Sequence, residues 1–127
     1  MIGNKTGKLG EDIAALFLER RGFHVKYRNY WKPYGEIDLI CEKAGKLHFI
    51  EVKTVSCLPA GTAHENYHAE QNVHRYKLKR LGRVIQSFLM KREYKDMDWQ
   101  FDICVVTIDN QQKKAKVKLI ENELLPE

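Results

Sequence analysis

Two apolar segments joined by a short turn signal constrain the fold of this chain more than any other feature. Residues 35–40 and 49–54 carry branched or aromatic side chains at many positions, and each has the length of a β-strand. Residues 42–46 lie between them and contain Ala44-Gly45, a pair typical of a hairpin turn. Segments this apolar are typical of strands that are buried on both faces. The sequence therefore predicts a β-hairpin within a covered sheet.

The predicted hairpin carries charged residues inside these apolar segments. Residues two apart on a strand share a face, so Glu36 and Asp38 point one way, as do Glu51 and Lys53. A turn at residues 44–45 places Asp38 opposite Glu51 and Glu36 opposite Lys53. Like charges directly opposite one another destabilise a sheet, and buried charges are costly unless they are paired or bind a metal. We therefore expect Asp38 and Glu51 to hold a cation.

The chemistry of these side chains favours a hard divalent cation, Mg²⁺ or Mn²⁺. Mg²⁺ is usually held by one or two carboxylates together with water and substrate phosphate. Asp38 and Glu51 supply two oxygens, and the backbone carbonyl of Val52 is a candidate third ligand. Lys53 can orient a water molecule or neutralise charge on a phosphate. Phosphodiester hydrolysis is the reaction that uses all of these groups. The alternative is that the four charged side chains have no catalytic role and form surface salt bridges on a solvated hairpin.

Two segments outside the hairpin have the periodicity of helices. Residues 6–21 place an apolar stripe at Leu9, Ile13, Leu16 and Phe17. From residue 73 onwards, apolar residues again recur at intervals of three and four, namely Leu81, Val84, Ile85, Phe88 and Leu89.

Strand patterns and one aromatic-rich turn complete the series of elements. The turn is residues 29–35, and the strands are residues 23–27, 99–108 and 115–121, the last an edge strand. Trp99 and Phe101 are expected in the core. The order α-β-β-β-α-β-β predicts an α/β (α+β) fold with a central mixed sheet flanked by helices.

Length and composition are typical of one soluble globular domain, residues 1–127. The chain is 43% hydrophobic and 31% charged, which excludes a disordered protein. No apolar run approaches the ~20 residues of a membrane span, and the N-terminus lacks the features of a signal peptide, so we expect a cytoplasmic protein. Cys41 and Cys104 fall in strand segments and are expected to be small, reduced core residues.

The net charge of +5 favours a polyanionic partner. Five cations cluster at the start of the second predicted helix, namely Arg75, Lys77, Lys79, Arg80 and Arg83. They either lie along a nucleic-acid phosphate backbone or form a solvated helix face. Lys77 and Arg80 are the preferred phosphate contacts.

Two further groups leave alternatives open. Aromatic residues before the hairpin either stack on unpaired bases or close the sheet edge as a cluster, which we favour; they are Tyr30, Trp31 and Tyr34. The poorly patterned segment after the hairpin contains metal-binding residue types, namely Cys57, His64, His68 and His74. No second pair has the spacing of a structural zinc site, so proton transfer or substrate contact is favoured over zinc. Plain solvent exposure of the histidines is favoured over both.

Three segments resemble a known family, and they are residues 7–15, 35–40 and 49–54. Twelve residues separate Asp38 from Glu51, and Lys53 follows at the next position but one. This spacing resembles the Asp…Glu-X-Lys signature of restriction-endonuclease-like (PD-(D/E)XK) nucleases. The segments resemble more closely the YraN-like family of small bacterial proteins, and they are similar to archaeal Holliday-junction resolvases.

The resemblance implies a restriction-endonuclease-like core and metal-dependent cleavage of DNA, with branched or Holliday-junction-like DNA as a substrate. It implies that Glu11 is a fourth active-site residue, whereas without it Glu11 is an ordinary carboxylate in the first turn of a helix. Glu36 is either a further metal ligand or a partner of Lys53. A homodimer is also implied, because two strand cuts need two sites. The chain departs from the family pattern at residues 55–74 and at Gln100, where substrate contacts are expected to differ.

Two other functions compete with a nuclease. One is a non-catalytic nucleic-acid-binding module on a nuclease scaffold, and the other is a structural or assembly factor. The complete set of charged residues argues against the binding module, since an inactive site has no reason to keep a costly charge cluster; the set is Glu11, Asp38, Glu51 and Lys53. The structural or assembly factor would behave independently of nucleic acid and salt.

Overall fold

The computed structural model describes residues 2–56 and 75–125, with side chains for residues 7–56 and 77–125. Its elements are α1 (Ile2–Arg20), β1 (His24–Lys32), β2 (Gly35–Lys43), β3 (Lys46–Ser56), α2 (Arg75–Leu89), the 3₁₀-helix η3 (Arg92–Tyr94), β4 (Trp99–Asp109) and β5 (Lys114–Ile120). The predicted α+β class and the predicted order of helices and strands are confirmed. No helix in these described segments is both long enough and apolar enough to cross a membrane.

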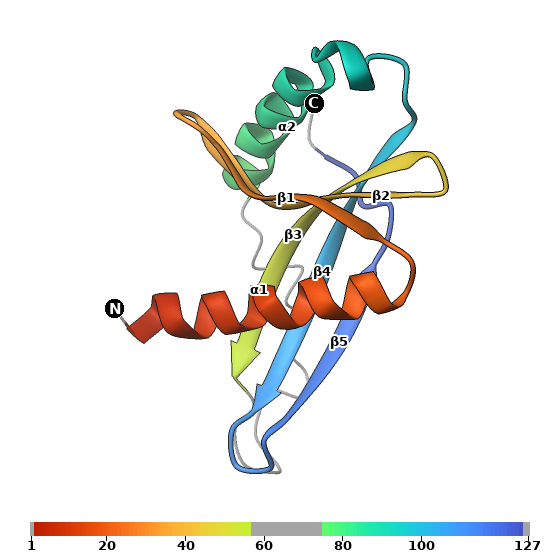
Figure 1. Ribbon diagram of the computed structural model, residues 1–127. Helices are drawn as coiled ribbons and strands as arrows, with labels where there is room; N and C mark the ends of the chain where they lie inside the picture. Colours follow the sequence, from red (N-terminus) through yellow and green to blue (C-terminus); the bar gives the residue numbers. More distant parts are fainter. Residues whose placement is uncertain (1, 57–74, 126–127) are drawn as a thin grey trace.

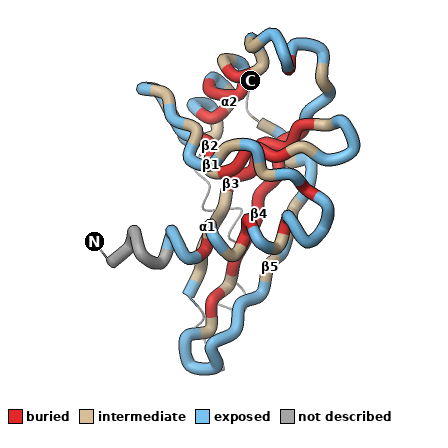
Figure 2. The backbone as a smooth tube through the Cα atoms, viewed as in Figure 1, coloured by how far each residue is buried: buried red, intermediate tan, exposed pale blue. Residues whose placement is uncertain are grey.

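The strands form one mixed sheet with a helix on each face. Their order is β1-β2-β3-β4-β5, and β3 and β4 are parallel while the other neighbours are antiparallel. Successive residues of β3 point to opposite faces. Phe49 packs in the cluster that contains Phe88 of α2, and Ile50 packs in the cluster that contains Leu18 of α1. The two helices therefore cover opposite faces of the sheet (Figure 1), and the buried residues lie mainly in β2, β3, β4 and α2 (Figure 2).

The predicted hairpin and its turn are confirmed. Residues of β2 and β3 pair from Lys43↔Lys46 to Leu39↔Ile50. The turn residues Ala44 and Gly45 have φ angles of 51° and 76°, as a two-residue hairpin turn requires.

β2 and β3 separate beyond the Leu39↔Ile50 pair. The remaining residues of β2 pair only with β1, and the remaining residues of β3 pair only with β4. Figure 1 shows the β1–β2 hairpin and the end of β3 diverging from this point. The predicted opposition of Glu36 and Lys53 is therefore wrong, because no ladder joins the strands there. Asp38 is the first residue of β2 inside this opening, which we call the fork.

An irregularity in β1 and β2 accompanies the fork. In each strand two residues three positions apart pack in the α2 cluster, namely Tyr27 with Tyr30 and Ile37 with Ile40. A regular strand alternates with a period of two and cannot place such pairs on one face. The irregularity lies between them, where Asn29 adopts the left-handed region at φ 54°. Because the alternation of side chains between the two faces is interrupted here, the residues between the interruption and the hairpin tip point to the opposite faces from those that a regular strand would give.

The buried face of α1 matches the predicted stripe in part, because Ile13 and Phe17 pack against the core as expected. Leu9 and Leu16 are 48% and 51% exposed, whereas Ala14 and Leu18 are buried. Gly10 explains the difference, because a Cβ there would lie 1.9 Å from the side-chain oxygen of Thr54 in β3. Small residues allow α1 to lie close against the sheet, so its contact face is the small-residue face.

Two further local predictions are corrected. The predicted aromatic turn over residues 29–35 is wrong, since β1 continues to Lys32; the ring of Tyr30 packs edge to face against Phe88, while Trp31 is 65% exposed. Phe101 is buried as expected, but Trp99 is 36% exposed at the start of β4. The strand prediction for residues 99–108 and 115–121 is confirmed by β4 and β5.

The cysteine prediction is confirmed for the two described residues. Cys41 and Cys104 are buried and free. Burial, and then the charge of Asp102, raise the pKa of each thiol to about 12. Both sulfurs are therefore unreactive core groups at neutral pH.

Candidate functional site

An open cleft of about 880 Å³ occupies the fork between β2 and β3. Residues of α1, β1 and α2 complete its walls. The structure brings together all six predicted catalytic or metal-binding residues, which line this cleft: Glu11, Glu36, Asp38, Glu51, Val52 and Lys53. Residues from three separate elements thus converge on one site.

Asp38 is anchored by the backbone of β3. The N–H of Val52 donates a hydrogen bond of 2.8 Å to Oδ2 of Asp38. Burial, followed by the charge of Glu51, raises the pKa of Asp38 to about 8, although the Val52 hydrogen bond and Lys77 oppose the shift. The neighbouring Glu51 carboxyl group thus favours the protonated form of Asp38.

Glu51 is a buried carboxylate with one unsatisfied oxygen. Its side chain is only 2% exposed, and Lys77 of α2 donates a hydrogen bond to Oε2. Oε1 has no hydrogen-bond partner among the described residues. Buried polar atoms without partners are rare and costly. Unpartnered Oε1 and the neighbouring Asp38 carboxyl provide hard oxygen donors that fit Mg²⁺ or Mn²⁺.

Lys77, which was predicted as a phosphate contact, forms an ion pair with Glu51. Its side chain is 56% exposed and reaches from α2 to Glu51. Burial lowers the pKa of Lys77, but the carboxylates of Glu51, Asp38 and Glu36 outweigh this and leave the pKa raised. Lys77 therefore carries its charge into the cleft. Sequence reasoning assigned Lys77 to phosphate because the fold that brings it to Glu51 depends on contacts distant in the chain.

Glu11 is held in position from β1. Arg28 Nε and Asn29 Nδ2 donate hydrogen bonds of 3.1 and 3.0 Å to its Oε1. Glu11 lies in the middle of α1, so the expectation of a first-turn carboxylate is wrong. Arg28 also contacts Asp12, and its hydrogen bond lowers the pKa of that carboxyl. Neither Arg28 nor Asn29 was predicted as a site residue, and the left-handed backbone of Asn29 had no signal in the sequence.

Glu36 and Lys53 lie on opposite arms of the fork. Burial, and then the charges of Glu11 and Glu51, raise the pKa of Glu36. Lys53 lines the same cleft from β3. Within the described segments no ion pair joins Glu36 and Lys53, so their predicted pairing is wrong.

The other predicted binding residues divide into two groups. Lys79, Arg80 and Arg83 are exposed on α2, as a phosphate-binding surface or a solvated face requires. Several predicted residues lie outside the described residues or side chains, namely Cys57, His64, His68, His74 and Arg75.

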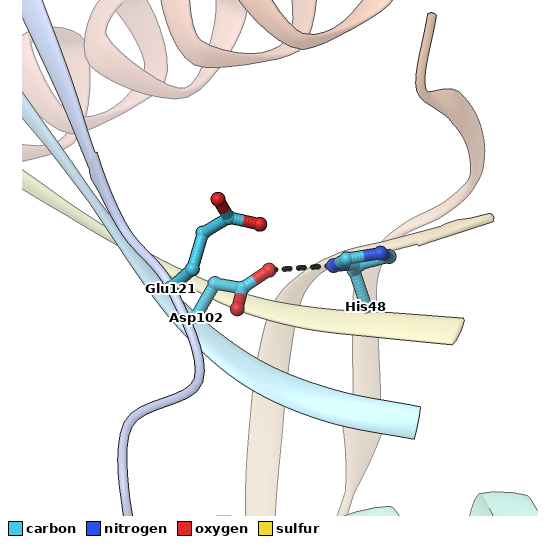
Figure 3. A group of neighbouring side chains, drawn as sticks. All are labelled: His48, Asp102 and Glu121. Atoms are coloured by element: carbon cyan, nitrogen blue, oxygen red, sulfur yellow. Dashed lines mark hydrogen bonds and ion pairs between the residues drawn. The ribbon is translucent and has the colours of Figure 1, made fainter. Parts of the chain in front are cut away.

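A second polar cluster joins β3, β4 and the segment after β5. His48 Nδ1 lies 2.7 Å from Asp102 Oδ2 in a buried pair, and Glu121 lies beside it (Figure 3). The other oxygen of Asp102 accepts hydrogen bonds from Gln100 Nε2 at 2.7 Å and from the backbone N–H of Asn122 at 2.9 Å. These protein donors satisfy both oxygens of Asp102 without a metal. We interpret the cluster as a structural network.

The sequence analysis did not identify this network. His48 and Gln100 were visible as polar residues within apolar strands, which was the available signal. His48 lies on β3 and Asn122 follows β5, so only the tertiary structure brings these two partners to Asp102 of β4.

The fold and the cleft define a small α+β protein with a cluster of carboxyl and ammonium groups at a fork in a mixed sheet. The chain belongs to the uncharacterised protein family UPF0102, whose pattern matches residues 10–106. The predicted membership of the YraN-like family is thereby confirmed.

Relatives of the chain match it over nearly their whole lengths. A UPF0102 protein of Moorella thermoacetica is 31% identical over 121 residues, which cover 95% of this chain and 96% of the relative. A UPF0102 protein of Dictyoglomus thermophilum is 35% identical over 113 residues, covering 89% and 91%. A UPF0102 protein of Campylobacter concisus is 37% identical over 117 residues, covering 91% and 90%.

Proposed function

We propose that this protein is a metal-dependent endonuclease that hydrolyses DNA phosphodiester bonds. The observation that carries the proposal is the convergence of Asp38, Glu51 and Lys53 on one cleft, where Asp38 is anchored to the backbone next to Glu51. A buried, unpartnered oxygen on Glu51 supports a cation ligand at this position. A surface salt bridge does not account for the Glu51 carboxylate, because this side chain is only 2% exposed.

Asp38 and Glu51 would hold Mg²⁺ or Mn²⁺, with the backbone carbonyl of Val52 as a further ligand. The bound cation would polarise a phosphoryl oxygen and increase the acidity of a coordinated water. Asp38 keeps one oxygen on the Val52 N–H, so its contribution to a cation is the other oxygen. Glu36 borders the same cleft and is a candidate outer ligand.

Lys53 and Glu11 would act on the reacting groups. Lys53 presents an ammonium that can neutralise charge developing on the phosphate. Glu11 is oriented by Arg28 and Asn29, so its carboxylate can position a water molecule in the cleft. The exposed cations of α2 would follow the phosphate backbone, which gives affinity without sequence preference.

The proposed substrate is branched DNA, and the proposed assembly is a homodimer. Two cuts on opposite strands need two active sites, and one chain supplies a single cleft of this composition in its described part. The net charge of +5 supports binding to a polyanion.

Cleavage of synthetic junction, flap and linear duplex DNA tests the proposal. We expect cleavage with Mg²⁺ or Mn²⁺, none with EDTA, and loss of at least about 100-fold in Asp38→Asn and Lys53→Ala. Asp96→Asn and Lys116→Ala make the same changes of charge at exposed positions outside the cleft and should keep full activity. Full activity in both cleft variants would contradict the assignment.

The ion pair between Lys77 and Glu51 favours one alternative, a non-catalytic nucleic-acid-binding module. Lys77 already neutralises the buried carboxylate without a metal. This alternative predicts gel shifts that persist in EDTA and in Asp38→Asn, with no cleavage of any substrate. Salt-dependent binding would identify the phosphate contacts.

A further inference from the structure

The contact between Lys77 and Glu51 joins groups with very different exposure. Glu51 is 2% exposed, whereas the side chain of Lys77 is 56% exposed. Lys77 is the residue of α2 that lines the cleft, while Glu51 itself belongs to the central strand β3. The carboxylate is thus fixed in the sheet, and its partner is a long side chain at the cleft wall.

The free-energy cost of breaking this ion pair differs for its two members. A buried carboxylate that loses its counter-charge is strongly destabilised. A half-exposed lysine returns to water at low cost, since its ammonium is well hydrated and its stem is flexible. The ammonium can therefore leave Glu51 readily, provided that another cation takes its place.

Lys77 and a divalent cation would compete for the same carboxylate. The ammonium occupies Oε2 of Glu51, and Oε1 of the same group is buried and has no hydrogen-bond partner in the part of the chain that the structure describes. Two cations held on one small carboxylate repel each other in a site of low dielectric constant. Arg28 is not a competitor of this kind, because its contacts are with Glu11 and Asp12.

We propose that Lys77 is an exchangeable counter-ion: it holds Glu51 in the metal-free protein and leaves it when a divalent cation binds the cleft. This inference rests on the metal site of the proposed function. Lys77 is a positioning residue under this scheme, because it acts on the metal through Glu51. Its release supplies a mobile ammonium to the cleft only when the cation is bound.

Calorimetric titration with Mn²⁺ tests the exchange. We expect Lys77→Met to bind Mn²⁺ about ten-fold more tightly than the wild type, because the competing charge is gone. Lys77→Arg keeps the charge and should bind like the wild type. Lys79→Met removes a charge from the exposed surface of the same helix and is the matched control, with unchanged affinity.

Thermal unfolding gives a second readout and shows that each variant folds. Without metal, Lys77→Met should unfold at a lower temperature than the wild type, because Glu51 then lacks its counter-ion. Saturating Mn²⁺ should raise its unfolding temperature by more than that of the wild type. A purely structural role for Lys77 predicts lower stability with equal or weaker Mn²⁺ affinity, and that result would overturn the exchange.

NMR of the lysine ammonium groups observes the release directly, with diamagnetic Mg²⁺ as the cation. The Lys77 signal, assigned by its absence in Lys77→Arg, should shift or broaden as Mg²⁺ saturates the site. An unchanged signal at saturation refutes the exchange and leaves the nuclease proposal intact. Release without cleavage of any DNA refutes the nuclease and leaves the exchange intact. Absence of Mn²⁺ and Mg²⁺ binding in the wild type and every variant overturns the exchange.

Discussion

Replacement of Asp38 by asparagine should stabilise the metal-free protein at neutral and alkaline pH. Burial and the adjacent Glu51 raise the pKa of Asp38 to about 8 from an ordinary value of 3.8. Asparagine preserves the oxygen that accepts the hydrogen bond from the Val52 N–H. Its amide group can donate to Glu51 in place of the shared proton, so the variant imitates protonated Asp38 without a titrating group.

The sign of the effect follows from proton binding. Between pH 4 and pH 8 the folded state binds a proton at Asp38 that the unfolded state has released. The contribution of Asp38 to stability is therefore complete below pH 4 and is lost as the pH rises toward 8. At about 1.36 kcal/mol for each unit of pKa, the loss at pH 7 has an upper limit of about 4 kcal/mol. Relaxation and water entry reduce it, so we expect about 1–3 kcal/mol.

Thermal unfolding in EDTA from pH 4 to pH 8.5, followed by circular dichroism, measures this effect. The unfolding temperatures of wild type and Asp38→Asn should coincide near pH 4 and separate by about 4–12 °C at pH 8. Asp96→Asn, an exposed control, should follow the wild type throughout. With saturating Mg²⁺ the wild type should unfold at the higher temperature, because only the wild type keeps both proposed carboxylate ligands, Asp38 and Glu51. A stability difference that does not change with pH would refute the reasoning.

Three further predictions concern other contacts. Gly10→Ala should destabilise the fold by about 1–3 kcal/mol in urea unfolding, because the added Cβ overlaps Thr54; the double variant with Thr54→Ala should recover most of the loss, and a simple sum of effects would contradict this. Asp102→Ala should cost about 3 kcal/mol in the same assay while Mn²⁺ affinity in calorimetry stays unchanged, whereas weaker Mn²⁺ binding would assign a metal to that network. Glu11→Gln should lower Mg²⁺-dependent cleavage by at least about ten-fold, but Asp12→Asn, which alters the other partner of Arg28, should not; equal effects would place the role in Arg28 rather than in Glu11.

The parts of the fold that depend on local patterns were predictable. The hairpin follows from a turn signal between two strands, and its register follows from that turn. α2 follows from apolar residues at helical spacing, of which Val84 and Phe88 are buried. The buried face of α1 was not predictable in this way, because it depends on the close approach of Gly10 to Thr54 on a distant strand. Side-chain size at the contact outweighed hydrophobicity there.

The candidate site was predictable to the extent that charges interrupt apolar strands. Asp38 and Glu51 stood out for that reason, and the fold brings them to one cleft. Lys77 carried no signal for a contact with Glu51, since it lies in a basic segment that predicts phosphate contacts. Arg28 likewise contacts Glu11, which lies 17 residues earlier in the chain. These partnerships depend on tertiary packing, which residue spacing does not encode.

The fork in the sheet and the charged site have a common physical origin. Past the Leu39↔Ile50 pair, β2 no longer supplies backbone acceptors to β3. The side chain of Asp38 takes over this role by accepting the N–H of Val52, so one carboxylate oxygen replaces a backbone carbonyl. That bond holds Asp38 next to Glu51, while the space between β2 and β3 beyond it remains open to solvent and ligand. Restoration of the ladder would remove both the opening and the constraint on Asp38, and a continuous sheet could therefore not hold this site.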